Sequence, residues 1–476
     1  MLHPLAYSAH PLAYSAMYRV LSALLTVVLV SGAAIFSSGV KTDDKPKNVI
    51  FFIADGCGPA SFGLAREYQR EVNGIPKLDL DAFQSGSVIT FADSSRITDS
   101  AASATAYACA IKTYNGAIGM DPNREPVETV LEMAEKAGYN TGIVSTASIT
   151  HATPAAFSSH VLQRGMQNEI AIQQLTKGIE IILGGGRGFY TSPEVGGFRP
   201  DSLDLIQRAI DAGYNNVNDR SELMAATEMP VIGLFTASHM AYEIDRDKAQ
   251  EPSIAEMTAK AVELLSASDK PYFIMIEAGR IDHAGHGNDP AAHIHDVLAY
   301  DQAWDVAVEM AREDGETLVI GTSDHETGGL TLGAQFYDGR LSGYAYDPTG
   351  YAGASSSIER YRSDLPWLDG KKILPSVGQL ADDMVELFGA NRDSAVKEAH
   401  DWGEARYQKG DSLAYLDLHW SISRAASASG RVGWSTGGHT AVNVPLFAFG
   451  PGAEGFSGVM DNTEVGEEIR AVLGLD

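Results

Sequence analysis

Seven short apolar runs, separated by segments with helical periodicity, recur through most of the chain. The runs lie at residues 48–54, 141–147, 179–183, 231–235, 272–276, 317–322 and 443–449. The helical patterns lie at residues 126–137, 201–212, 252–266, 290–312 and 462–473. Regular alternation of strand and helix is typical of a mostly parallel sheet with helices on both faces. The pattern therefore predicts an α/β fold, a sandwich of three layers.

Residues 331–432 interrupt this alternation. The segment is rich in Gly, Ser, Tyr and Asp, contains one convincing helical pattern near residues 376–389, and gives way to the strand and helix order at Gly433. Its Tyr and Trp content is too high for a flexible linker. We expect an inserted subdomain at 331–432, between a first core part at 41–330 and a last core part at 433–476.

Residues able to bind metal lie at the ends of the predicted strands: most follow a strand, and His439 precedes the last one. The motifs are IADGCG, EAGRIDHAGH, SDHETGG and STGGHTAVNVP, and together they supply Asp55, Glu277, Asp282, His286, Asp324, His325 and His439. In open α/β sheets ligands bind beyond the carboxyl ends of the strands. Three histidines and four carboxylates are a ligand mixture expected for zinc together with a harder ion. One such residue alone would more often be a cap or a turn residue.

The candidate nucleophile is Ser100, in RITDSAASATAYACAIKT. It follows Asp99 and opens an Ala- and Ser-rich helical run, so its hydroxyl would lie at a helix N-terminus, where backbone N–H groups favour an anion. On local sequence alone a helix-capping serine is the more common explanation. A nearby metal cluster favours the nucleophile, because a metal can activate a hydroxyl without a catalytic histidine.

The first forty residues have the pattern of a targeting segment. HPLAYSA occurs twice, at residues 3–9 and 10–16, which indicates Met17 as the true start. An apolar stretch from Val20 to Phe36, interrupted by small residues, is typical of a signal peptide within a leader at 1–40. An uncleaved anchor helix is the alternative, although the stretch is short for a membrane span. No later segment is apolar enough to span a bilayer. Only Cys57 and Cys109 are present, so at most one disulfide can form.

The charge balance of the chain is strongly acidic. Its 35 Lys and Arg residues stand against 62 Asp and Glu, a formal net charge of −27 over 476 residues. Nucleic acids and anionic membranes require basic surface, so neither is expected as a general partner. A surface poor in lysine and rich in acids favours solubility in salt, and we expect the protein to be halotolerant.

Six motifs together resemble the alkaline phosphatase family. They are DGCG, TDSAASATAYA, HATPAAFSSHVLQR, EAGRIDHAGH, SDHETGG and GGHTAVNVP, and the resemblance runs from about Asn48 to the C-terminus. It is closest to the bacterial branch that includes cold-adapted and marine enzymes. The resemblance implies a three-layer core with an inserted, crown-like subdomain, and a homodimer.

The resemblance also implies roles for particular residues. Ser100 is similar to the nucleophile that becomes phosphoserine, and Arg164 to the guanidinium that holds two phosphate oxygens. Asp282, His286 and His439 resemble the ligands of a first zinc, and Asp55, Asp324 and His325 those of a second. The family's magnesium site is similar to the set of Asp55, Thr153 and Glu277.

Two histidines depart from the enterobacterial pattern of the family. His151 stands in place of an aspartate, which makes the third metal site less acidic. His283 stands in place of a lysine. Unless it is buried, it would titrate near neutrality, so that phosphate contacts through it would weaken at high pH. Other branches of the family carry histidine at both positions.

The sequence thus predicts a secreted or periplasmic phosphatase of broad specificity. The expected reaction is hydrolysis of phosphate monoesters through a phosphoserine, with two zinc ions and a third metal, magnesium. Its partners would be small phosphate monoesters and inorganic phosphate, with no stable membrane association once the signal peptide is removed. A phosphodiesterase, a nucleotide pyrophosphatase or a sulfatase on the same metal core is an alternative, as is a silent metal- or phosphate-binding protein of the envelope.

Overall fold

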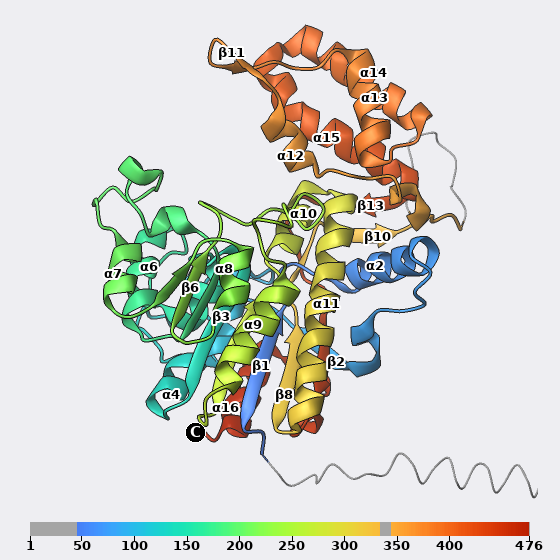
Figure 1. Cartoon of the computed structure of the whole chain (residues 1–476). Helices are drawn as coiled ribbons and strands as arrows, with labels where there is room; N and C mark the ends of the chain where they lie inside the picture. Colours follow the sequence, from blue (N-terminus) through green and yellow to red (C-terminus); the bar gives the residue numbers. More distant parts are fainter. Residues whose placement is uncertain (1–44, 334–343, 476) are drawn as a thin grey trace, which may run out of the picture. The chain divides into compact units, whose positions relative to one another are not determined.

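A ten-stranded sheet forms the centre of the molecule in the computed structural model, which describes residues 45–333 and 344–475 (Figure 1). The strand order is β16-β2-β15-β8-β1-β7-β3-β4-β6-β5. Their bounds are β1 Asn48–Ile53, β2 Gln84–Ile89, β3 Asn140–Ser148, β4 Ile181–Gly185, β5 Asn215–Val217, β6 Val231–Leu234, β7 Tyr272–Glu277, β8 Thr317–Thr322, β15 Val444–Phe449 and β16 Gly458–Asp461. Strand β15 alone runs antiparallel to its neighbours, β2 and β8. The expectation of a mostly parallel sheet is confirmed.

Helices cover the two faces of this sheet, as the alternation predicts. Strand β1 shows why: Ile50 and Phe52 point into one apolar cluster, and Val49, Phe51 and Ile53 point into another. The first face is covered by α2 (Pro59–Val72), α9 (Ile254–Ser266) and α11 (Pro290–Asp314). The second is covered by α3 (Ser100–Cys109), α4 (Val130–Lys136), α5 (Ala152–Ser158), α7 (Leu205–Asp211) and α16 (Asn462–Leu473).

Two predicted helices begin later than the sequence pattern indicates. Helix α4 starts at Val130 rather than near Pro126, because Thr129 and Glu132 form a reciprocal capping box at its N-terminus. Helix α7 starts at Leu205 rather than at 201, because the Asp204 side chain accepts the Gln207 N–H and ends the preceding loop. Side-chain caps, rather than the apolar period, set both boundaries.

The remaining elements are short or lie outside the two layers. Their bounds are α6 Gln167–Thr176, α8 Arg220–Ala225, α10 Arg280–Gly287, β9 Glu326–Thr327, β14 His439–Thr440, η1 Asp79–Phe83, η2 Arg187–Phe189, η3 Pro193–Val195 and η5 Ala453–Gly455. Cys57 and Cys109 are both buried as free thiols, so the single possible disulfide is not formed.

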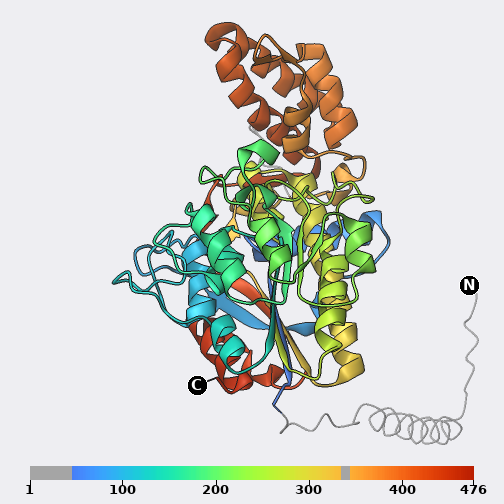
Figure 2. The same ribbon diagram turned by 60° about the vertical axis from the view of Figure 1, so that its left-hand side comes forward.

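Segment 331–432 folds into a group of helices that begins and ends at a pair of antiparallel strands. Strand β10 (Leu330–Leu332) pairs antiparallel with β13 (Val432–Trp434), so the chain leaves and re-enters the core at one place. Between them lie α12 (Ile358–Asp364), α13 (Val377–Phe388), α14 (Arg392–Lys409), α15 (Asp411–Gly430), η4 (Pro348–Tyr351), β11 (Trp367–Leu368) and β12 (Lys371–Lys372). Figure 2 shows these helices gathered at one end of the core.

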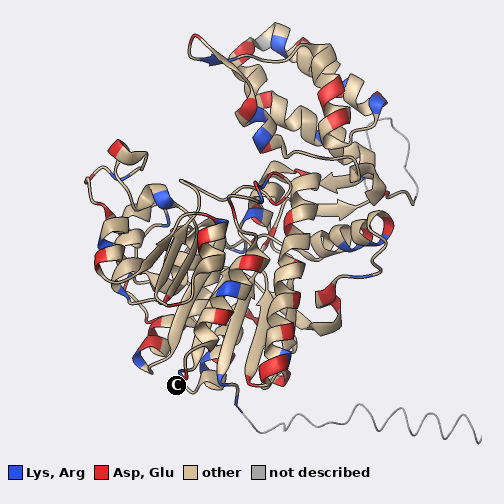
Figure 3. Cartoon of the chain, viewed as in Figure 1, with Lys and Arg blue, Asp and Glu red and all other residues tan. Residues whose placement is uncertain are grey.

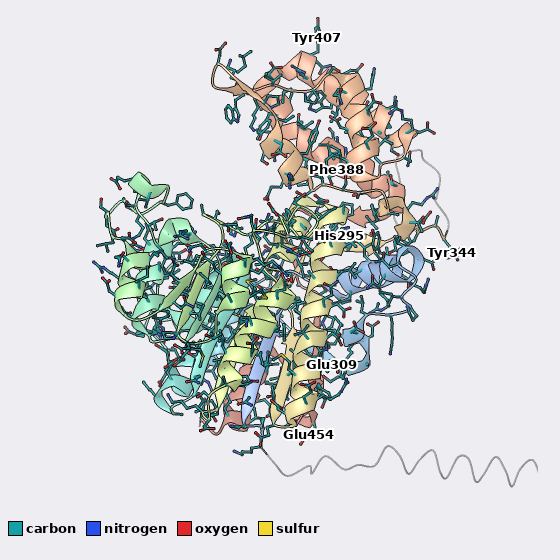
Figure 4. The ribbon with its side chains drawn as sticks, in the orientation of Figure 1. His295, Glu309, Tyr344, Phe388, Tyr407 and Glu454 are labelled. Carbon is teal, nitrogen blue, oxygen red and sulfur yellow. The ribbon has the colours of Figure 1, made fainter. Side chains whose placement is uncertain are left out.

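The helix expected near 376–389 is confirmed as α13, but the expectation that it is the only clear helix of this segment is wrong. Helix α14 is mostly charged and α15 mixes Ala and Ser with apolar residues, so neither has a strong apolar stripe. They are stabilised by packing on one another around Trp402, Leu418 and Ile422. In Figure 4, Phe388 lies among these helices, and Tyr407 projects away from them.

The leader predicted at 1–40 lies outside the described residues. In the part of the chain that the structure does describe, no helix combines the length and the hydropathy that crossing a membrane requires.

Candidate metal centre and active site

Four neighbouring strands bring the predicted ligands to one edge of the sheet. Strands β8, β1, β7 and β3 lie side by side and are parallel. Their carboxyl ends are followed by Asp324 and His325, by Asp55, by Glu277 and helix α10, and by His151 and helix α5. Because β15 runs in the opposite direction, the segment that precedes it, with His439 in β14, reaches the same edge. All predicted ligands therefore converge there.

The first group of ligands consists of Asp282, His286 and His439. The Nε2 atom of His439 lies 3.2 Å from Nε2 of His286 and 3.6 Å from Oδ1 of Asp282. His286 Nε2 lies 3.4 Å from Oδ2 of Asp282. All three side chains thus present their ligand atoms to one point.

Backbone carbonyls fix the tautomers of these two histidines. His286 Nδ1 lies 2.7 Å from the Gly437 carbonyl, and His439 Nδ1 lies 2.8 Å from the Thr98 carbonyl. A carbonyl only accepts, so each Nδ1 carries the proton and each Nε2 is left with a lone pair. Two lone pairs that face each other beside a carboxylate fit a shared cation, and this arrangement is usual for histidines that bind zinc.

The second group surrounds Ser100. His325 Nε2 lies 3.2 Å from Ser100 Oγ, 3.2 Å from Asp324 Oδ2 and 3.6 Å from Asp55 Oδ1. The Thr327 hydroxyl donates to Asp282 at 2.6 Å and accepts from His325 Nδ1 at 3.2 Å, so Nε2 of His325 is again free to act as a ligand. His325 also lies within the reach of the first group, its ring stacked on His439 with centroids 3.5 Å apart.

The third group joins Asp55 to Glu277, with His151 and Thr153 from the start of α5. One ligand atom each from Asp55, His151 and Glu277 lies within 4.8 Å of the others. One oxygen of Glu277 is bonded to the Ser145 hydroxyl, and the other is buried without a partner. The Thr153 hydroxyl is also buried without a partner. These atoms fit a hard cation that takes oxygen ligands.

Burial and mutual repulsion make these carboxylates poor anions when no cation is bound. Burial raises the pKa of Asp55 well above its usual value, and the charges of Asp324, Asp282 and Glu277 raise it further. Burial likewise raises the pKa of Glu277 to about 7. Both carboxylate oxygens of Asp55 and Oδ2 of Asp324 are buried with no hydrogen bond. Unpaired buried acids are costly, and bound cations remove that cost.

Ser100 is the first residue of helix α3, and the preceding Asp99 caps the helix. Asp99 Oδ1 accepts the Ala102 N–H at 3.0 Å, so capping does not require the Ser100 hydroxyl. Oδ2 of Asp99 accepts from the Gly116 N–H and from Arg164 Nη1, at 3.0 and 3.1 Å. The guanidinium of Arg164 is thereby held next to the helix N-terminus, where an anion would bind.

A cluster of three histidines lies beside Arg164. His151 Nε2 accepts from Arg164 Nη2 at 2.9 Å, and the rings of His151, His239 and His283 lie with centroids 4.4 to 5.5 Å apart. Burial, and then the charge of Arg280, lowers the pKa of His283 well below its usual value. Titration near neutrality was expected only for an unburied His283, so that expectation does not apply here.

Sequence reasoning missed four residues of this region. His239 lies in the histidine cluster and accepts the Ser148 N–H at 3.1 Å. Thr327, Asp99 and Arg280 orient His325, Arg164 and His283 respectively. His239 reaches the site from the loop after β6 and carries no motif. Asp99 and Thr327 lie inside quoted motifs, which could have identified them.

The comparisons with known proteins agree with this geometry. The family model described as alkaline phosphatase matches residues 46–475. The chain belongs to the alkaline phosphatase family. It is therefore an enzyme, a hydrolase of phosphate monoesters with a metal site.

Relatives of the chain within this family come from fungi and from bacteria. The chain is 37% identical to the repressible alkaline phosphatase of Saccharomyces cerevisiae, covering 95% of this chain and 86% of the yeast protein. It is 33% identical to alkaline phosphatase 3 of Bacillus subtilis, covering 90% and 89%. Among solved structures, the cold-active alkaline phosphatase of a psychrophilic Shewanella is 30% identical with a TM-score of 0.76, covering 90% and 99%. The expected likeness to cold-adapted bacterial enzymes is confirmed, alongside a fungal one.

Proposed function

We propose that the enzyme hydrolyses phosphate monoesters through a phosphoserine formed on Ser100. The observation that supports this most directly is the position of the Ser100 hydroxyl. It lies at the N-terminus of α3, 3.2 Å from Nε2 of His325 and among carboxylates suited to bind cations. A hydroxyl in that position can act as the nucleophile without a separate general base.

Each of the following residues has its own role in the proposed reaction. Ser100 Oγ attacks phosphorus in line with the ester oxygen, the bond to the alcohol breaks, and water then cleaves the phosphoserine. Arg164, held by Asp99 and His151, binds two phosphate oxygens, and the backbone N–H groups at the start of α3 add positive potential. Bound metal ions would lower the pKa of the serine hydroxyl and stabilise the charge on the departing oxygen.

We propose that three metal ions use the three groups of ligands. Zinc binds Asp282, His286 and His439, and a second zinc binds Asp55, Asp324 and His325, because imidazole and carboxylate suit zinc. Magnesium binds Asp55, Thr153 and Glu277. His151 and His283 lie beside this metal site and beside the phosphate. A structural neighbour, a histidine-to-aspartate mutant of the alkaline phosphatase TAB5, has magnesium in its M3 site, which supports magnesium on this fold.

We further propose that the protein is secreted or periplasmic and acts as a homodimer. The leader pattern at residues 1–40 supports export. Segment 331–432 exposes large apolar side chains, a composition that favours an interface. They include Trp367, Leu368, Tyr407, Leu413 and Leu416. The acidic charge argues against nucleic acid as a partner.

A comparison of three substrates tests the proposed reaction. The zinc- and magnesium-loaded enzyme is assayed with 4-nitrophenyl phosphate, bis(4-nitrophenyl) phosphate and 4-nitrophenyl sulfate. We expect kcat/KM for the monoester to exceed the other two by orders of magnitude, because Arg164 and the metal groups are arranged for a terminal phosphate with two negative charges. A preference for the diester or the sulfate would refute the proposal.

A further inference from the structure

A cavity of about 290 Å³ lies between the core and the inserted helices. The core contributes Tyr242, His283, Gly287 and Asp289, and the inserted segment contributes Glu359, Arg362, Ser363, Tyr415 and His419. We refer to it as the α10–α12 pocket. Its volume approaches the range of sites that bind small organic molecules.

This pocket adjoins the proposed phosphate site. His283 and Gly287 lie four residues apart on α10, next to Asp282 and His286, which are also four apart. On a helix such pairs form adjacent stripes, so the pocket begins one residue round the helix from two proposed metal ligands. The His283 ring also contacts His151, which accepts a hydrogen bond from Arg164. A phosphate held by Arg164 would have its ester oxygen near this opening.

The walls of the pocket are fixed by contacts between the two regions. Arg280, almost fully buried, donates to Glu359 of α12 at 2.6 Å and to His283 at 2.7 Å, and its guanidinium lies 3.8 Å from the Tyr242 ring centre. His419 Nε2 of α15 donates to the Gly287 carbonyl at 2.6 Å. The walls that the core and the inserted segment contribute to the pocket are thereby held in place before any ligand binds.

Arg362 is the charged group of this pocket that lacks a partner. Glu359 is paired with Arg280, and the Asp289 carboxylate accepts the backbone N–H groups of Ala292 and Ile358 at 3.1 and 2.7 Å. Arg362 makes no hydrogen bond or ion pair with any residue that the structure describes, and its Nε is buried without a partner. Its guanidinium lies 4.6 Å from the Tyr415 ring centre. A guanidinium with free donors fits a carboxylate or a phosphate.

We propose that the α10–α12 pocket binds the alcohol part of the phosphate monoester, and that Arg362 selects substrates whose alcohol part carries a second anionic group. This inference rests on the proposed function, because that function places the scissile phosphate at Arg164. The inserted segment thus contributes to substrate choice, while the core performs the chemistry.

A matched pair of substrates tests the proposal. 4-Carboxyphenyl phosphate and 4-carbamoylphenyl phosphate have nearly the same shape, and only the first has a second anionic group besides the phosphate. We expect the metal-loaded enzyme to favour the carboxylate about tenfold to a hundredfold in kcat/KM, the range that hydrogen bonds to charged groups provide.

Three variants identify the residue responsible. Arg362→Met keeps most of the aliphatic stem but removes the charge, and we expect the preference to fall to nearly one. Arg362→Lys keeps the positive charge and should retain part of the preference for the carboxylated substrate. Arg360→Gln alters an arginine of the same helix that bonds to Asp364 and to the Asp245 carbonyl, outside the pocket, and should retain all of it. Circular dichroism and thermal unfolding establish that each variant is folded.

Equal kcat/KM values for the two substrates in the parent enzyme, or a preference that survives Arg362→Met, would overturn the proposal. Calorimetric binding of the two corresponding arylphosphonates separates this result from a failure of the proposed function. If the enzyme hydrolyses neither ester, the proposed reaction is wrong. Tighter binding of the carboxylated phosphonate that depends on Arg362 would still support the pocket, and equal binding would refute it.

Discussion

The metal edge of the sheet and the inserted helices differ in how their buried side chains are satisfied. At the metal edge Asp55, Thr153, Glu277 and Asp324 all have buried oxygens without hydrogen-bond partners. Across helices α12–α15 the interior is apolar, and among the side chains that the structure describes there, only Arg362 has a buried nitrogen without a partner. Bound cations would therefore stabilise the first region, whereas the second is stabilised mainly by apolar packing.

Removal of metal should have the largest effect and should act on the metal edge. Prolonged chelation should abolish activity and lower the thermal midpoint, because it leaves the buried carboxylate of Asp55 beside those of Asp324, Asp282 and Glu277, which repel it. Zinc should restore most of both. The far-ultraviolet circular dichroism of the helices should change little at 25 °C. If the enzyme kept full activity after a loss of metal verified by mass spectrometry, the proposed dependence of the metal edge on cations would be contradicted.

Arg164→Ala should reduce kcat/KM by about a hundredfold, the cost typical of removing one oriented donor from a phosphate or oxyanion site. Because the arginine orients phosphate but does not react, the variant should still form a phosphoenzyme and should bind inorganic phosphate weakly. Arg187→Ala is a suitable control, since the Arg187 guanidinium bonds to Asn218 rather than to a proposed ligand. If inorganic phosphate inhibited Arg164→Ala as strongly as the parent enzyme, a residue other than Arg164 would hold the phosphate.

Replacement of residues 333–431 by a two-residue turn tests the other region. Leu332 and Val432 are paired in an antiparallel ladder, so a tight turn can join them. We expect a smaller particle by light scattering, with zinc still bound, because this segment supplies no proposed metal ligand. Leu416→Asp, at an exposed position of α15, should weaken assembly without removing the segment. An unchanged mass in both would exclude an interface role.

Salt should have the smallest effect, and it should act over the whole surface. Without residues 1–40, which contain one Arg and no acid, the charge is 34 minus 62, or −28. Acidic residues are spread over the outer helices of both regions (Figure 3). The Debye length falls from about 30 Å at 0.01 M to about 3 Å at 1 M, so repulsion is screened. We expect the thermal midpoint to rise by a few degrees in sodium chloride; a steady fall would show that repulsion is not dominant.

The two regions also differ in how much their sequences predict. Much of the metal edge could be inferred because Asp55, Glu277, Asp324 and His325 lie at the ends of apolar runs, and parallel strands present their carboxyl ends at one edge. Asp55, Glu277, Asp324 and His325 therefore converge from distant parts of the chain. His239 follows strand β6, a parallel strand of the same sheet, so the same rule places it at this edge; it lacks a motif that would assign it a role.

The inserted helices show the limit of local pattern. Helices α14 and α15 have weak apolar periodicity, and Trp402 is buried because it packs between them and donates to the Ala414 carbonyl at 2.8 Å. The sequence indicated an ordered segment and its helix α13, but not helices α14 and α15. The pocket with Arg362 could not be predicted either, because its walls come from α10, α12 and α15, which meet only in the folded protein.

The acid-trapped phosphoenzyme tests the central claim, that the serine beside His325 at the metal edge is the nucleophile. The metal-loaded enzyme is mixed with excess inorganic phosphate, quenched in acid, digested and analysed by mass spectrometry, in parallel with Ser100→Ala and the nearby control Ser94→Ala. We expect one added phosphoryl group, located on Ser100, in the parent and in the control, and none in Ser100→Ala. A phosphoryl group that persists in Ser100→Ala, or that maps to another residue of the parent, would contradict the account.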